Sequence, residues 1–196
     1  MKKMEKLGGK NKDESGELLQ LIARLDALLN PTKDKGFSER ISREVRRLFE
    51  SKKIQGIYEG MGDKILNEYV DRKYPYTGAA TRNDKLNTLL KSNWFLNRIY
   101  RRLKLPVPPE RFINEKVYRY GKRGASLFEW YIGLYFLGTG GQLPKRTQMI
   151  KNNLYNYFDK IFADITISPG NERELELTWY EFTTHQQKIK YLKESD

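Results

Sequence analysis

The chain has 196 residues and a formal charge of +12, from 37 lysines and arginines against 25 aspartates and glutamates. The absence of cysteine excludes disulfide scaffolds, cysteine nucleophiles and cysteine-based metal sites. The single histidine, His185, leaves little room for a histidine-rich metal centre or a Ser-His-Asp triad. The longest apolar stretch, residues 130–137, is far shorter than the roughly 18 residues of a membrane span. The composition therefore predicts one intracellular domain with appendages, whose charge suits a polyanionic partner.

The chain divides into three parts by composition. Residues 1–16 are lysine-rich and interrupted by Gly8-Gly9, which predicts a disordered basic arm. This arm has neither the apolar core of a secretory signal nor the arginine-rich pattern of a mitochondrial presequence. Residues 17–162 carry the periodicity of a helical domain, and residues 163–196 are predicted to form a C-terminal extension.

Apolar residues recur at helical spacing through most of the central part. Helices are predicted over residues 18–29, 41–51, 57–75, 84–103 (one long helix or two joined end to end), 126–137 and 147–162. Residues 126–137 are apolar on nearly all sides, which predicts a buried central helix.

Beyond Ala163 the apolar residues alternate instead of following a helical period. Ile165 and Ile167 precede the turn-forming residues 169–171, and Leu175, Leu177 and Trp179 follow them. This pattern predicts a small β-hairpin. The expected architecture is therefore an all-α domain with a small C-terminal β-hairpin extension.

Three carboxylates stand on otherwise apolar helices. Glu59 and Asp63 are one helical turn apart, and Glu129 lies in the most hydrophobic predicted helix, where an unpaired carboxylate is costly. Converging carboxylates would suit a hard cation such as Mg²⁺. Taken alone, however, two acids four residues apart are more often a solvent-exposed helix face paired with nearby lysines and arginines.

The order of these segments resembles the ribonuclease III family. Residues 58–66 read Tyr-Glu-Gly-Met-Gly-Asp-Lys-Ile-Leu, similar to the family's signature run Leu-Glu-Phe-Leu-Gly-Asp-Ala-Val-Leu. Residues 84–103 look like the family's next helix pair. Residues 125–135, Ala-Ser-Leu-Phe-Glu-Trp-Tyr-Ile-Gly-Leu-Tyr, match its second signature, Asp-x-Phe-Glu-Ala-Leu-x-Gly-Ala-Leu-Tyr. The resemblance covers roughly residues 40–162 and implies a ribonuclease III endonuclease-domain fold.

The resemblance also implies a catalytic site of two Glu and two Asp that bind Mg²⁺ for phosphodiester hydrolysis. Glu59, Asp63 and Glu129 occupy three of these positions, and Ser126 replaces the fourth, an Asp. A hydroxyl carries no charge and is a poor Mg²⁺ ligand, which favours a degenerate site. A structural alternative stays open, because Ser126 and Glu129 have the spacing of a capping box that would open the helix without any metal.

Basic residues mixed with aromatics surround the proline-rich boundary at residues 106–109. A cationic surface of this kind suits the phosphates of structured RNA, whereas a solvated helix face and loop is the plainer interpretation. The candidate RNA-binding residues are Arg98, Arg101, Arg102, Lys104, Arg111, Lys116, Arg119, Lys122 and Arg123.

Two functions follow as expectations from this resemblance. The first is a structural RNA-binding protein without cleavage or cofactor, similar to the ribonuclease-III-like proteins of the large mitochondrial ribosomal subunit, which bind rRNA in the matrix. The alternative is an active Mg²⁺-dependent endonuclease that cuts double-stranded RNA, cytoplasmic and homodimeric. In either case we expect a dimer, with itself or with a related domain, and no membrane association.

Overall fold

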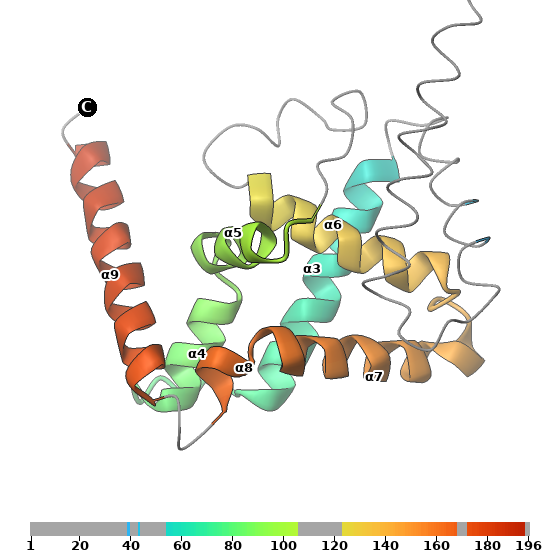
Figure 1. Cartoon of the computed structure of the whole chain (residues 1–196), viewed down its shortest axis with the longest axis horizontal. Helices are drawn as coiled ribbons and strands as arrows, with labels where there is room; N and C mark the ends of the chain where they lie inside the picture. The colour runs from blue at the N-terminus through green and yellow to red at the C-terminus, as the bar shows by residue number, and fades with distance from the viewer. Residues whose placement is uncertain (1–38, 40–42, 44–53, 106–122, 168–171, 195–196) are drawn as a thin grey trace, which may run out of the picture.

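The computed structural model describes residues 39, 43, 54–105, 123–167 and 172–194. Over these residues the protein is all-α, as predicted (Figure 1). The described helices are α3 (Ile54–Lys73), α4 (Arg82–Leu90), α5 (Asn93–Arg102), α6 (Arg123–Gly138), α7 (Pro144–Ile161), α8 (Ala163–Thr166) and α9 (Glu172–Glu194). The basic arm, the helix predicted over residues 18–29 and most of that over residues 41–51 lie outside the described residues.

The predicted stretch 84–103 forms two helices rather than one. A capping box opens α4: the Thr81 hydroxyl accepts from the Asp84 N–H at 3.2 Å, and the Asp84 carboxylate accepts from the Thr81 N–H at 3.1 Å. The Thr77 N–H also donates to Asp84, at 2.6 Å, and these hydrogen bonds, led by that from Thr77, lower the pKa of Asp84 to about 2. Ser92 then caps α5 by accepting from the Phe95 N–H.

Helices α3 and α6 share the largest interface among the described helices, and it brings their backbones into contact. A Cβ atom added to Gly62 would lie 1.7 Å from the Glu129 carbonyl oxygen, and one added to Gly133 would lie 1.9 Å from the Tyr58 carbonyl oxygen. Each helix thus contributes one glycine against the other's backbone. Helix α6 is buried from residue 124 to residue 136, which confirms the predicted central helix.

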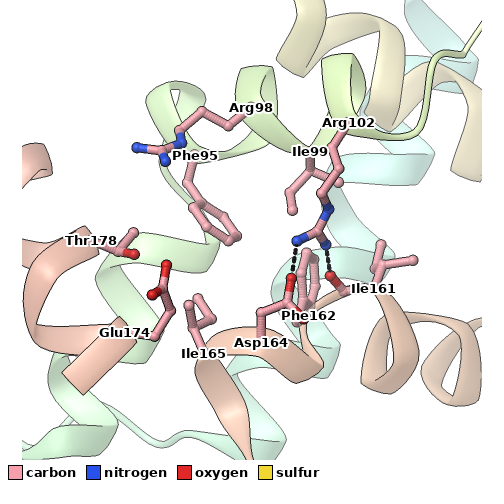
Figure 2. Close-up of a pocket in the computed structure, with 10 residues that line it drawn as sticks. All are labelled: Phe95, Arg98, Ile99, Arg102, Ile161, Phe162, Asp164, Ile165, Glu174 and Thr178. Carbon is pink, nitrogen blue, oxygen red and sulfur yellow. Dashed lines mark hydrogen bonds and ion pairs between the residues drawn. The ribbon is translucent and has the colours of Figure 1, made fainter. Parts of the chain in front are cut away.

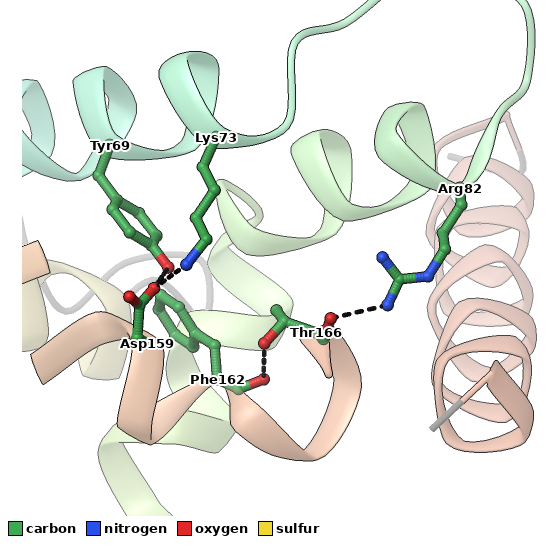
Figure 3. Close-up of polar contacts among 6 residues, drawn as sticks. All are labelled: Tyr69, Lys73, Arg82, Asp159, Phe162 and Thr166. Atoms are coloured by element: carbon green, nitrogen blue, oxygen red, sulfur yellow. Dashed lines mark hydrogen bonds and ion pairs between the residues drawn. The ribbon is translucent and has the colours of Figure 1, made fainter. Parts of the chain in front are cut away.

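Aromatic packing and hydrogen bonds attach α7 and α8 to the α3–α4 region (Figure 3). The Tyr69 hydroxyl donates to Asp159 at 2.6 Å, and Lys73 forms an ion pair with the same carboxylate. The Tyr69 ring lies 5.0 Å from that of Phe158 in the core. Farther along, the Arg82 guanidinium donates to the Thr166 carbonyl oxygen at 2.8 Å. None of the helices in the described ranges combines the length and the apolar character that a membrane crossing needs.

The predicted C-terminal β-hairpin is wrong over the described residues. Ile165 lies in α8, and Leu175, Leu177 and Trp179 all lie in α9. Only part of the alternating pattern faces the core: Leu175 is 1% exposed, whereas Leu177 is 51% exposed. The buried face of α9 consists of Leu175, Thr178 and Phe182, whose spacing of three and four residues is helical.

Helix α9 packs beside α4 and α5 (Figure 1). Two ion pairs join it to them: Glu176 with Lys85 of α4, at 2.6 Å, and Glu181 with Arg98 of α5. The Phe182 ring also lies 5.7 Å from that of Trp94. Long-range contacts that a short alternating pattern could not reveal therefore stabilise the helix.

We predict that Gly62→Ala destabilises the protein by about 1–3 kcal/mol, because the new methyl group overlaps the backbone of α6 and forces the two helices apart. Gly60→Ala is a matched control in the same helix, since a Cβ there meets no atom within 4 Å. That change should raise stability by about 0.5–1 kcal/mol through helix propensity alone. Urea unfolding of both variants measures the difference, and equal midpoints would contradict the packing described here.

Candidate functional site

The crossing of α3 and α6 places the two helical segments that resemble the ribonuclease III signatures against each other. Gly62 contacts the Glu129 backbone, so the next residue, Asp63, lies at the same crossing. Asp63 is exposed and Glu59 is half-buried on α3, whereas Ser126 and Glu129 on α6 are only 8% and 9% exposed. The crossing therefore offers two accessible carboxylates on one helix and a buried serine and glutamate on the other.

The interpretation of Ser126 as a helix cap is wrong. Helix α6 begins at Arg123, so Ser126 stands in its first turn and not before it. The first N–H groups of a helix have no hydrogen-bond partner within the helix. One of them in α6, the Ala125 N–H, donates to the Asn97 side-chain oxygen at 2.9 Å. Helix α5 thus supplies a hydrogen-bond acceptor to the start of α6, and a hydroxyl at position 126 is not needed for capping.

The donor set at this crossing does not fit the Mg²⁺ site that the family resemblance implies. Among the residues that the structure describes, no three His, Asp or Glu side chains gather closely enough to hold a metal ion. Asp63 instead accepts a hydrogen bond from the Asn67 amide on the next turn of α3, at 2.9 Å. Ser126 presents a neutral oxygen where a fourth carboxylate would be required.

Two of the predicted RNA-binding arginines are paired with carboxylates. Arg98 forms an ion pair with Glu181 of α9, and its guanidinium lies 4.8 Å from the ring centre of Trp94. Arg102 forms an ion pair with Asp164 of α8 and donates to the Ile161 carbonyl oxygen (Figure 2). These contacts hold α8 and α9 against α5, so both arginines have a structural role.

The other candidate cations differ from this pair. Arg101 and Lys104 are exposed, and neither side chain forms an ion pair or hydrogen bond with another described residue. Arg123 begins α6. Arg111, Lys116, Arg119 and Lys122 lie outside the described residues. Among the candidate RNA-binding residues that the structure describes, Arg101 and Lys104, at the end of α5, are therefore the exposed cations without such a partner.

Sequence reasoning misses the carboxylates that face the arginines of α5. The alternating pattern places Asp164, Glu174 and Glu181 in or beside a hairpin and gives them no role, although all three lie near α5 in the fold. The available signal is the helical spacing of residues 175, 178 and 182. That spacing predicts α9, but not the helix that α9 packs against.

No family model matches the chain, and neither a curated protein nor a solved structure matches it. The resemblance to the ribonuclease III family therefore rests on the residues of the two signature helices and the helix pair between them.

Proposed function

We propose that this protein is an RNA-binding protein of ribonuclease III fold with a degenerate catalytic site. Its role is that of a structural component of the large mitochondrial ribosomal subunit, where it binds rRNA in the matrix. The observation that carries the proposal is the burial of Ser126, three residues before the buried Glu129 on α6, the helix that crosses α3. A neutral group there removes one of the four charges with which the family holds Mg²⁺.

The charge of the chain supports RNA as the partner. A net charge of +12 gives a long-range attraction for a polyanion, and phosphate contacts need cations that are not neutralised by neighbouring carboxylates. Arg101 and Lys104 meet this condition among the described residues, since both are exposed and make no ion pair there. Binding of this kind requires neither a metal nor a reaction.

An active Mg²⁺-dependent endonuclease is the second candidate. The observation in its favour is that Glu59, Asp63 and Glu129 all lie on the two helices that cross at Gly62, although they do not form a cluster of metal-binding geometry. In that case Mg²⁺ would activate water for cleavage of double-stranded RNA, and the enzyme would act as a cytoplasmic homodimer.

We further propose that α3 carries a dimer interface with a second copy or a related domain. Gly62 is occupied by α6 within the same chain, so it is not available for a partner. Gly60 is exposed with no atom near its Cβ position, and Ile57 on the preceding turn is 56% exposed. This part of α3 has both the room and the apolar surface that close helix packing requires.

The first experiment compares Ser126→Asp with the neutral, equally sized Ser126→Asn. We expect no cleavage of long double-stranded RNA in Mg²⁺ by the unmodified protein. The Asp variant should bind Mg²⁺ more tightly than the Asn variant, because carboxylate charge sets the strength of such sites. Calorimetric Mg²⁺ titration of both variants, with helicity checked by circular dichroism, measures this difference.

Cleavage by the unmodified chain decides between the two candidates whether or not the variants fold. If it produces staggered cuts that Glu129→Gln abolishes, the degenerate-site proposal is overturned and the endonuclease is correct. Equal Mg²⁺ affinity of folded Asp and Asn variants would contradict the assignment of position 126 as a former ligand position.

We predict that the double variant Arg101→Glu/Lys104→Glu weakens binding to structured RNA and flattens its salt dependence. Removal of one phosphate contact should reduce the slope of log K against log salt by about 0.7–0.9. Lys145→Glu/Lys160→Glu is the matched control, because it changes the charge of two exposed lysines of α7 in the same direction. Fluorescence anisotropy at several salt concentrations measures both slopes, and equal effects of the two double variants would reject a local binding surface.

For the dimer, we expect Gly60→Leu to produce monomers, since a large side chain blocks close approach of a second helix. Gly60→Ala should leave the dimer largely intact. Light scattering after size-exclusion chromatography measures the mass of each. An unmodified chain that is monomeric at high concentration, and that is isolated from native lysate without a folded partner, would refute the proposed interface.

A further inference from the structure

A hollow of about 240 Å³ opens where α5, α8 and α9 meet (Figure 2). Its apolar surface comes from Phe95 and Ile99 of α5 and from Phe162 and Ile165 around α8. Pockets for drug-sized ligands usually measure about 300–1,000 Å³, so this one suits a single planar ring system rather than a larger molecule. None of these residues belongs to the crossing of α3 and α6.

The hollow has both cationic and anionic lining groups, and one of them, Asp164 of α8, is paired with Arg102. Arg98 and Arg102 line it from α5, and Glu174 and Thr178 line it from α9, as Figure 2 shows. Glu174 makes no hydrogen bond or ion pair with another described residue, although it extends toward the apolar surface. The Glu174 carboxylate therefore lines the same hollow as the Arg98 guanidinium, whereas the Arg102 guanidinium is taken up by Asp164 and the Ile161 carbonyl oxygen.

This order of groups matches one nucleobase better than the others. Guanine carries two donors side by side, N1–H and N2–H₂, followed by two acceptors, O6 and N7. A carboxylate accepts from the donor pair, and an arginine is the most frequent partner of O6 and N7. Adenine would place its N1 lone pair against the carboxylate, and cytosine and uracil lack the second acceptor on a fused ring.

We infer that this hollow is a guanine-binding site. The base enters the hollow between α5 and α9, where Glu174 accepts from N1–H and N2–H₂ and Arg98 donates to O6 and N7. Arg98 can do this while paired with Glu181, because only its Nη1 atom is used there and a guanidinium has five N–H donors. An unpaired guanine of a folded RNA, splayed out of its stack, is one source of this base, and a free guanine nucleotide is the other.

The inference that RNA supplies the base rests on the proposed function, whereas guanine selectivity itself does not. The first experiment therefore titrates the full chain with GMP and with AMP and follows binding by calorimetry or NMR. We expect GMP to bind at least about tenfold more tightly than AMP, and Glu174→Gln to remove this preference by replacing a charged acceptor with an amide. Glu172→Gln is the matched control, because Glu172 stands in the same first turn of α9 but does not line the hollow.

A second experiment uses three RNA duplexes that differ at one position. The first has a bulged guanine there, the second has a bulged adenine, and the third has no bulge and is fully paired. Tighter binding of the bulged-guanine RNA, abolished in Glu174→Gln and kept in Glu172→Gln, supports RNA as the source of the base. GMP selectivity without any RNA binding would refute the proposed function and support a free nucleotide as ligand. Equal affinity for GMP and AMP, with the three RNAs bound alike, would overturn the guanine site while leaving RNA binding intact.

Discussion

The reciprocal contact between α3 and α6 is the constraint on which the rest of the structure depends. Gly62 meets the backbone of Glu129, and Gly133 meets the backbone of Tyr58, so the two helices cross with no side chain between them at either point. Any β-carbon there would push the axes apart and open gaps in the core, and protein interiors are normally packed as densely as organic crystals. The same two contacts set how the helix segment with Asp63 lies against the segment with Ser126 and Glu129, so the geometry of the candidate site follows from the packing of the core.

A second set of interactions attaches the C-terminal helices and creates the hollow. Arg98 and Arg102 of α5 pair with Glu181 of α9 and Asp164 of α8, and Phe182 packs against Trp94. Exposed ion pairs of this type contribute little stability individually. Their effect here is mainly one of orientation, since they fix where α8 and α9 lie on α5. Glu174 and Thr178 of α9 and the two arginines of α5 thereby line the same hollow, so side chains that attach the helices also form its wall.

The two parts of the molecule divide the proposed activities between them. The crossing of α3 and α6 carries Glu59, Asp63 and Glu129 together with a neutral serine at position 126. The surface of α5 has the cations, of which Arg102 is held by Asp164 and Arg101 is exposed. The proposed RNA binding uses exposed cations of this kind, and among the described residues no three His, Asp or Glu side chains gather closely enough to hold a metal ion.

The sequence by itself determined the helical class and the burial of α6. It also showed that acidic residues stand next to glycines on α3. These features can be found in the sequence because apolar spacing and helix-breaking residues are local properties of the chain. It did not determine the C-terminal end, where the alternation of Leu175 and Leu177 suggested a strand although Leu177 faces solvent. It also could not show that Asn97 caps α6, or that Glu181 and Asp164 neutralise two candidate RNA-binding arginines. These partners lie 28, 83 and 62 residues apart along the chain. Only the tertiary structure decides such pairs, because a contact across that separation depends on how whole helices pack and not on the local pattern of either segment.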